Sequence, residues 1–528
     1  MSSDCPLRPW ETVVLYLALA VAALFPVFAV AFPPLADLPN HLARAHIMAN
    51  LAADPALQPH YAIEWQLLSF QVSDLILPAL VEWVGIEAAA RIFILATFAA
   101  LLGGVLALHK VLFGRVGVWP ALAFLLIYNF MFGWGLLSYL FSTGLALLLL
   151  AGWIHTAPRE GLPRSAGFAI ATVLLFFFHF LALAVFALTV LAFELWRWRH
   201  DRHHLVRRML LSGAVFVMPA ALFLLAPRAT IPMLNYYGDG ADKVRAILAP
   251  FNLYFGWQDL LLEFLALLLA AIGIWKRLFP VAPALRGPLI AVGGAALLMP
   301  NQLMSVWGSD FRLPTVFLLL LIAATDLPSK KRAPAAIFVA AVVALLLVRV
   351  GTVTADWRRL DDDITELRAA LTVIDRGSKV AVVQSIRDDR NPPAPSLYPY
   401  RHLGAFAVID RDVFLPQLFS AATPLRFISP GDRWTTDQLA VIRDPKWHPS
   451  DPAFAADVRS QLQARVVTQA IQQFELATST VDWTDWPERF DFLVAFDYGH
   501  PVNPVPALLT ELKRGSFFSI YRIHAPAP

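Results

Sequence analysis

The sequence predicts a mainly α-helical, polytopic membrane protein with about eleven transmembrane helices, followed by a water-soluble α/β domain. The first observation is composition: 58% of the 528 residues are hydrophobic and 15% are charged, whereas soluble domains carry about 25% charged residues. The second is a series of apolar runs that continues to about Val350, and the third is the charge-rich sequence that follows. Together they predict a transmembrane domain at 1–351 and a soluble α/β domain at 352–528.

The charge pattern is typical of a membrane protein and gives no support for a nucleic-acid partner. The net charge is only +3, and Lys and Arg gather in short clusters between the apolar runs, as topology signals do. Cys5 is the only cysteine, so an internal disulfide is excluded and a thiolate metal site is disfavoured. The first apolar run has no small-residue cleavage site before Pro33, so we interpret it as a retained helix and not a signal peptide.

The apolar runs give the order of the expected spans. A helix needs about 20 residues to cross roughly 30 Å of hydrocarbon. The candidate spans are Thr12–Phe32, Leu67–Val84, Ile92–Leu108, Val118–Phe132, Leu136–Ile154, Phe168–Leu195, Met209–Ala226, Leu260–Trp275, Leu289–Val306, Leu313–Thr325 and Ala335–Val350.

Three basic loops predict the orientation. They lie at 197–208, 276–286 and 330–332, and with this span order all three fall on one side, which the positive-inside rule makes cytoplasmic. Another basic set falls on the opposite side: Lys110, Arg115, Arg159 and Arg164. We therefore expect a multi-pass protein of the inner (plasma) membrane, with its N-terminus in the cytoplasm and its C-terminal domain outside.

The C-terminal region has the periodicities of both helix and strand. Trp357–Asp375 repeats apolar residues at helical spacing, whereas Lys379–Gln384, Phe490–Phe496 and Phe517–Arg522 are apolar runs of strand length. These patterns predict an α/β fold.

The loop after the first span carries the first candidate site. If a helix starts near Leu38, His41 and Arg44 lie one turn apart on one face, and Asp37 stands at the beginning of that helix. A carboxylate, an imidazole and a guanidinium would then face one another, with Asp37 and His41 as candidate catalytic residues. The alternative is structural, because Asp is a favoured N-cap residue and Arg44 would then contact only lipid phosphate.

Two further outer segments contain candidate substrate-binding residues. Asp310 and Arg312 lie between two predicted spans, and a guanidinium matches paired phosphate oxygens; the alternative is an interfacial Asp–Arg pair that anchors a helix end. Tyr236, Tyr237 and Asp239 combine aromatic rings with a carboxylate, which suits a sugar; the alternative is a solvated loop.

Other residue types restrict the chemistry. His179 lies inside a predicted span, where an ionisable group usually faces a cavity or a neighbouring helix; we interpret it as a neutral histidine that is hydrogen-bonded to such a helix. The sequence has no Walker loop, dinucleotide glycine motif, zincin helix or nucleophile elbow. It also has no clear metal motif. The sequence therefore identifies no cofactor, and binding of a divalent cation stays an alternative. A polar outward face without nucleotide motifs favours a lipid-borne substrate.

In layout, the chain resembles the GT-C superfamily of polytopic glycosyltransferases, which use polyprenyl-phosphate sugars. Asp37 stands in the first outer loop just after the first span, the position of the catalytic acid in that superfamily. Gly85–Arg91, a span and then Leu112–Arg115 are similar to the segment around its third span, and Trp357–Gln384 is similar to the start of its outward-facing domain.

The resemblance implies an inverting sugar transfer at the outer face. Asp37 would be the general base toward an acceptor hydroxyl, and Arg44 or Arg312 would hold the donor phosphate. The implied partners are a lipid-linked sugar donor, membrane lipid and a glycan, lipid or protein acceptor of the cell envelope. The alternative function is a transporter or a non-catalytic envelope-assembly protein, which paired half-helices or repeated halves would favour.

Overall fold

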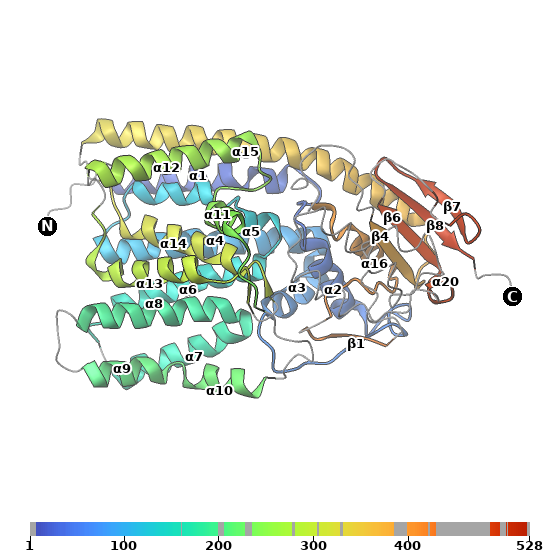
Figure 1. Ribbon diagram of the computed structural model, residues 1–528, viewed down its shortest axis with the longest axis horizontal. Coiled ribbons are helices and arrows are strands. Elements are labelled where there is room, and N and C mark those ends of the chain that lie inside the picture. Colours follow the sequence, from blue (N-terminus) through green and yellow to red (C-terminus); the bar gives the residue numbers. More distant parts are fainter. Residues whose placement is uncertain are drawn as a thin grey trace. The chain divides into compact units, whose positions relative to one another are not determined.

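The computed structural model describes residues 7–159, 161–198, 205–226, 235–276, 280–303, 306–327, 331–384, 399–420, 423–428, 486–496, 503 and 505–524. Four basic residues of the predicted cytoplasmic loops lie outside these ranges: Arg199, Arg202, Arg277 and Lys330. The chain forms two compact units (Figure 1). We call 1–33, 66–73 and 90–357 the helical unit, and 34–65, 74–89 and 358–528 the mixed unit. This division differs from the predicted break at Gly351, because two N-terminal segments belong with the C-terminal region.

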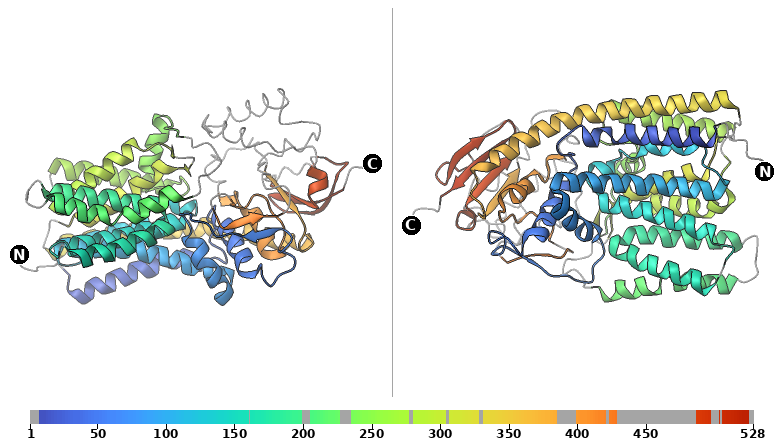
Figure 2. Two further views of the ribbon diagram at one scale, coloured as in Figure 1. Left: turned by 90° about the horizontal axis from the view of Figure 1, so that it is seen from below. Right: turned by 180° about the vertical axis from the view of Figure 1, so that it is seen from behind.

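Helices run side by side through the helical unit, as Figures 1 and 2 show. They are α1 (Pro9–Phe28), α4 (Ile86–Phe113), η1 (Trp119–Leu126), α5 (Phe130–Gly133), α6 (Leu137–His155), α7 (Leu162–Phe178), α8 (Phe180–Trp198), α9 (Leu205–Ala214), α10 (Val217–Leu225), α11 (Gly240–Leu248), α12 (Trp257–Lys276), η2 (Pro283–Leu285), α13 (Arg286–Leu298), α14 (Ser309–Ala324) and α15 (Arg332–Ala370). A short hairpin of β2 (Gln302–Leu303) and β3 (Val306–Trp307) precedes α14.

The apolar helices agree with the predicted membrane domain. Among the described residues, 5 helices are long and apolar enough to cross a membrane, or up to 6 if the bent pair α9 and α10 is one span. Three shorter apolar helices accompany them: Trp119–Gly133, Leu162–Phe178 and Pro283–Leu298. The number of about eleven spans stays a prediction.

Two predicted spans are wrong. Leu67–Val84 contains only α3 (Val72–Val84), whose 13 residues are too few to cross and which belongs almost entirely to the mixed unit. Phe168–Leu195 is a hairpin of two helices that breaks at His179, whose backbone is extended at φ −165° and ψ 115°. Phe168 of α7 therefore stacks on Phe186 of α8, with ring centroids 6.3 Å apart. The predicted span therefore corresponds to two packed helices, of which α8 is long enough to cross a membrane and α7 is a shorter apolar helix.

With these two spans corrected, the basic loops lie at one end of the helical unit. Arg164 and Arg208 line one pocket with Glu194, so the start of α7 lies beside the end of α8. Gly287 of α13 packs against Ala192 and Trp196 of α8.

Further contacts extend the same end. The Ala282 amide donates to the Ala324 carbonyl at 2.8 Å, and Arg115 binds Asp326, which follows α14. The described residues of 109–117, 153–159, 161–164, 194–198, 205–212, 282–287, 324–327 and 331–332 therefore form what we call the basic end. We expected Lys110, Arg115, Arg159 and Arg164 on the opposite side, and this expectation is wrong. The two wrong spans, Leu67–Val84 and Phe168–Leu195, had placed the whole segment between them on the opposite side.

The mixed unit combines a small sheet with helices from both parts of the chain. Its elements are α2 (Leu38–Asn50), β1 (Tyr61–Ile63), α3, the end of α15, η3 (Leu371–Val373), β4 (Val380–Gln384), η5 (Leu403–Ala405), α16 (Phe406–Arg411), β5 (Leu425–Phe427), α20 (Trp486–Arg489), β6 (Phe492–Phe496), β7 (Leu509–Arg514) and β8 (Phe518–Ile523). The sheet order is β4-β6-β8-β7, with β4 parallel to β6 and the other pairs antiparallel. The predicted strands at 379–384, 490–496 and 517–522 are confirmed.

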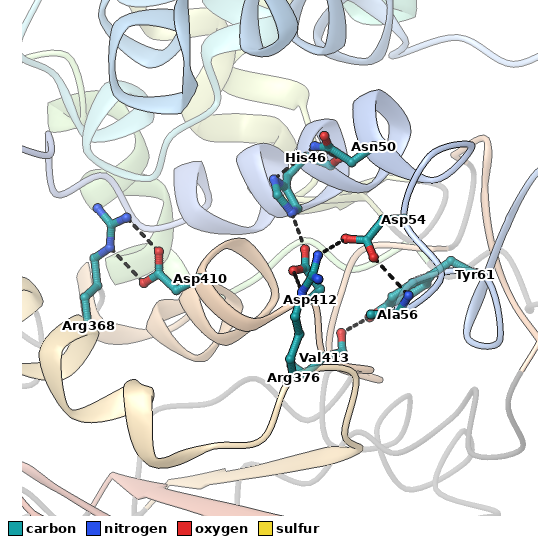
Figure 3. Close-up of polar contacts among 10 residues, drawn as sticks. All are labelled: His46, Asn50, Asp54, Ala56, Tyr61, Arg368, Arg376, Asp410, Asp412 and Val413. Atoms are coloured by element: carbon teal, nitrogen blue, oxygen red, sulfur yellow. Dashed lines mark hydrogen bonds and ion pairs between the residues drawn. The ribbon is translucent and has the colours of Figure 1, made fainter.

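Polar contacts tie the N-terminal segments into the mixed unit (Figure 3). His46 of α2 lies 2.7 Å from the Asp412 carboxylate, Nε2 to Oδ1, and Arg376 donates to the other oxygen at 2.7 Å. Arg376 also binds Asp54. In addition, β1 pairs with β5. Residues 34–65 are therefore an integral part of this unit.

Candidate functional site

Asp37 stands at the N-cap position of α2 but does not cap it. Its backbone is already helical, at φ −88° and ψ −11°, and its side chain makes no capping hydrogen bond, whereas capping residues usually have extended backbone. The residue is 9% exposed. The structure therefore contradicts the explanation of Asp37 as a cap.

The partner of Asp37 is a histidine from the C-terminal part of the chain. Nε2 of His402, the residue before η5, lies 3.3 Å from Oδ1 of Asp37. Among the described residues, no other side chain forms an ion pair with this carboxylate. No sequence pattern pointed to His402, because hundreds of residues separate it from Asp37.

A phenylalanine and an asparagine fix the geometry of this pair. The Phe419 ring lies 5.0 Å from the ring of His402 and 5.5 Å from that of His41. Asn40 of α2 donates to the Gln417 carbonyl at 3.1 Å and accepts from the Phe419 amide at 2.8 Å. Asn40 is 1% exposed, and its two hydrogen bonds hold the 417–419 segment against α2.

His41 and Arg44 follow on the same face of α2, as predicted. Nη2 of Arg44 lies 3.3 Å from Nδ1 of His41. Arginine can only donate, so Nδ1 accepts and the neutral ring carries its proton on Nε2. Burial, together with the Arg44 charge, lowers the pKa of His41 from 6.5 to about 3.

Arg44 has a buried partner that the sequence analysis missed. Its Nε and Nη2 donate to Oδ1 of Asp74 at 2.8 and 2.5 Å, and the two side chains are 2% and 3% exposed. Burial raises the pKa of Asp74, and Arg44 acts in the opposite direction. A signal was present in the sequence: Asp74 is a carboxylate inside a predicted span, where a charge is costly without a partner. Asp37, His41, Arg44, Asp74 and His402 form what we call the α2 cluster.

The two other candidate segments, one with Tyr236 and one with Asp310, meet at one end of the helical unit. The amide and carbonyl of Tyr236 pair with those of Gln302, both at 2.9 Å. Lys243 of α11 donates to the Met299 carbonyl at 2.6 Å and lies 3.3 Å from the Asp310 carboxylate. Asp310 is fully buried and also accepts from Asn301 at 3.2 Å. Asp310 therefore has Lys243 as its charge partner.

Arg312 lies on the first turn of α14, beside the ring of Tyr139. Its Nη1 donates to the Trp307 carbonyl at 2.8 Å, and its guanidinium lies 5.6 Å from the centre of the Tyr139 ring. The Tyr139 hydroxyl donates to the Arg312 carbonyl at 3.0 Å. These contacts hold the planar guanidinium in one orientation.

Asp239 and Tyr237 have simpler environments. Asp239 accepts from the Asp242 amide at 2.8 Å and forms a capping box on α11, so its contacts are those of a helix cap. Tyr237 is 64% exposed.

His179 lies at the tip of the α7–α8 hairpin and not within a span. Its ring packs against Phe70 at 4.5 Å and Tyr139 at 5.2 Å. Its Nδ1 accepts from the Leu181 amide at 3.2 Å.

Within the described ranges, no group of three or more His, Cys, Asp or Glu residues has the arrangement of a metal site. The α2 cluster contains a carboxylate and a neutral imidazole, which are components of proton transfer, beside the buried Arg44–Asp74 pair.

No protein-family model and no curated protein matches the chain. Two solved structures align with it. The crystal structure of ArnT from Cupriavidus metallidurans bound to undecaprenyl phosphate aligns with a TM-score of 0.49 and 13% identity, over 98% of this chain and 100% of that chain. The same protein in the apo state aligns with a TM-score of 0.46 and 13% identity, over 98% and 99%.

Proposed function

We propose that this chain is a membrane glycosyltransferase that moves a sugar from a polyprenyl-phosphate donor to a cell-envelope acceptor. The observation that carries the proposal is the buried Asp37 carboxylate, which stands at a helix start without capping it and is paired with His402 at 3.3 Å. A carboxylate held in this way is suited to accept a proton from a hydroxyl group.

In this mechanism Asp37 is the general base. The acceptor O–H proton passes to Asp37, and the acceptor oxygen forms a bond to the anomeric carbon. The bond from that carbon to the phosphate oxygen breaks, and the polyprenyl phosphate leaves with the electron pair. The result is inversion at the anomeric carbon. His402 orients the base through Oδ1.

We assign His41 a donor role in the same step. Its pKa of about 3 keeps the ring neutral near pH 7, and Arg44 occupies Nδ1. The Nε2–H group is then a hydrogen-bond donor for a substrate oxygen. Arg44 is bound to Asp74, so we assign it the role of fixing the His41 ring.

Arg312 of the helical unit stays a candidate for binding a phosphate group. Its guanidinium is held by the Trp307 carbonyl and over Tyr139, and a fixed planar fork matches a phosphate group. Tyr236 and Tyr237 remain candidates for sugar contact.

The purified full-length protein provides the direct test. In lipid nanodiscs with a polyprenyl-phosphate sugar and an envelope extract as acceptor source, we expect sugar transfer and release of polyprenyl phosphate. A panel of polyprenyl-phosphate sugars from which the protein transfers none would contradict the proposal.

We also propose that the basic end faces the cytoplasm and that the mixed unit lies outside. The support is the gathering of Arg115, Arg164 and Arg208 at one end. Reporter fusions after Arg159, Arg208 and Lys331 should report the cytoplasm, and one after Arg376 should report the outside. An external signal after Arg159 would contradict this arrangement.

A further inference from the structure

A second histidine–carboxylate pair of the mixed unit lies outside the α2 cluster and outside the proposed chemistry (Figure 3). Nε2 of His46 lies 2.7 Å from Oδ1 of Asp412, and the two side chains are only 18% and 12% exposed. His46 lies in the second half of α2, and Asp412 is the residue that follows α16. Because α2 and α16 pack against each other, the pair joins two helices near their C-terminal ends.

Asp412 has a backbone conformation that favours glycine. Its φ of 54° and ψ of 34° are left-handed, and its amide donates to the Val408 carbonyl at 3.0 Å at the end of α16. Aspartate adopts this region more readily than most residues, but glycine adopts it without steric cost. The side chain that the chain carries there accepts from Arg376 at 2.7 Å as well as from His46. The position therefore combines a turn that suits glycine with a carboxylate that joins three segments.

The same two segments carry Asp37 and His402 at their other ends. His46 follows Asp37 along α2, and Asp412 follows His402 along η5 and α16. The two contacts therefore lie at opposite ends of a parallel pair of helical segments. A helix rises about 1.5 Å per residue, so a slip of one residue between the segments would move His402 by about 1.5 Å relative to Asp37. A contact of 3.3 Å would not survive that shift.

Other contacts fix α16 within the mixed unit. Nε and Nη2 of Arg368 donate to the two carboxylate oxygens of Asp410 at 2.9 and 2.7 Å (Figure 3). The Tyr61 hydroxyl donates to the Val413 carbonyl at 3.0 Å and accepts from the Leu415 amide at 2.8 Å. The end of α16 is therefore a fixed element from which α2 can take its position.

We propose that His46 and Asp412 are positioning residues for sugar transfer. Their contact sets the register between α2 and α16, and this register holds His402 beside Asp37. The inference rests on the proposed function, in which Asp37 is the general base. Both residues act through His402 and not on the substrate, so their loss should lower kcat and leave the KM for the lipid donor nearly unchanged.

Transfer kinetics of the full-length protein in lipid nanodiscs, with a polyprenyl-phosphate sugar, test the proposal. Asp412→Gly keeps the left-handed backbone and removes the carboxylate, so kcat should fall by about tenfold or more, because a displacement of about 1 Å can cost up to about 100-fold. His46→Ala should cause the same fall. His46→Gln should restore most of the rate, since its amide nitrogen can still donate to Asp412.

The matched control is Arg376→Gln. It removes the other partner of Asp412, whose side chain is 57% exposed, and leaves the contact with His46 intact. An exposed ion pair contributes little, so kcat should change by less than about twofold. Equal losses of kcat in Arg376→Gln and His46→Ala, or in His46→Gln and His46→Ala, would overturn the assignment.

A double variant and a measurement without substrate complete the test. In a His402→Ala background, Asp412→Gly should cost no further rate, because both changes remove the same contribution. Amide hydrogen exchange of Asp412→Gly should become faster in α2 and α16 and stay unchanged in β6 and β8. A further loss of rate in the double variant, or unchanged exchange in α2, would overturn the positioning role. A wild-type protein that transfers no sugar would instead overturn the proposed function, and this inference with it.

Discussion

Asp37 and Asp239 occupy the same position in two helices, the residue before the first turn of α2 and of α11, but their carboxylates have different partners. Asp239 is exposed, has extended backbone and accepts from the Asp242 amide at 2.8 Å. Asp37 is 9% exposed, has helical backbone and lies 3.3 Å from His402. The helix-start position alone therefore does not define the role of an aspartate; its backbone conformation and its partner do.

The surroundings of the two helices differ in the same way. The α2 cluster contains the buried pair Arg44–Asp74, with side chains 2% and 3% exposed. Within α11 itself, Arg245 pairs with Asp242, and these side chains are 48% and 14% exposed. Because water screens exposed charges and not buried ones, the α2 cluster should be the more sensitive to substitution.

The largest difference in stability should follow from breaking the buried pair. Asp74→Ala leaves Arg44 as an unpaired buried charge, which lowers the free energy of unfolding by about 3–5 kcal/mol. Arg245→Ala breaks the exposed pair and should change it by about 0–1 kcal/mol. Thermal unfolding of the purified variants measures both. Equal shifts in melting temperature would contradict the proposed difference between the two regions.

A second difference concerns pH. The pKa of His41 is lowered from 6.5 to about 3 in the folded protein, so between these values the unfolded state binds more protons. The stability that neutral His41 contributes is complete above pH 6.5 and is lost as the pH falls toward 3. The melting temperature of the wild type should therefore fall more between pH 7.5 and pH 5 than that of His41→Gln.

The control for this experiment is His155→Gln, because His155 is exposed at the basic end. Its melting temperature should fall with pH as much as that of the wild type. An equal fall in all three proteins would mean that His41 does not titrate as its surroundings require.

The smallest expected effects compare the two helix starts themselves. Asp239→Ala removes a capping bond and should lower stability by about 1 kcal/mol, whereas Asp239→Asn should change it by only a few tenths. Asp37→Ala removes no capping bond, so any loss of stability in it comes from the pair with His402. A stability difference between Asp37→Ala and Asp37→Asn equal to that between Asp239→Ala and Asp239→Asn would restore the explanation of Asp37 as a cap.

Hydropathy and the alternation of apolar residues predicted much of the fold. They failed where the structure depends on contacts between residues that are far apart in the sequence. The strands β4, β6 and β8 were predicted because they are apolar runs between turn residues. Strand β7 was missed because its sequence LTELKR is polar and largely exposed. The α7–α8 break was missed because it occurs at His179, without glycine or proline.

The candidate site was predicted only in part for the same reason. Helical spacing brought Asp37, His41 and Arg44 to one face of α2. The partners Asp74 and His402 come from segments that reach α2 only through folding, and no local pattern connects them to it. In the loop before α11, spacing alone did not show that Asp239 caps the helix, because that role depends on its backbone conformation.

The central claim is that Asp37 is the general base, and transfer activity of matched Asp→Asn variants tests it most directly. Asp37→Asn keeps the size of the side chain and removes the proton acceptor, so the transfer rate should fall by about 100-fold or more with little change in melting temperature. Asp239→Asn makes the same substitution at a true cap and should leave the rate unchanged. An Asp37→Asn variant that transfers sugar at the wild-type rate would contradict the account.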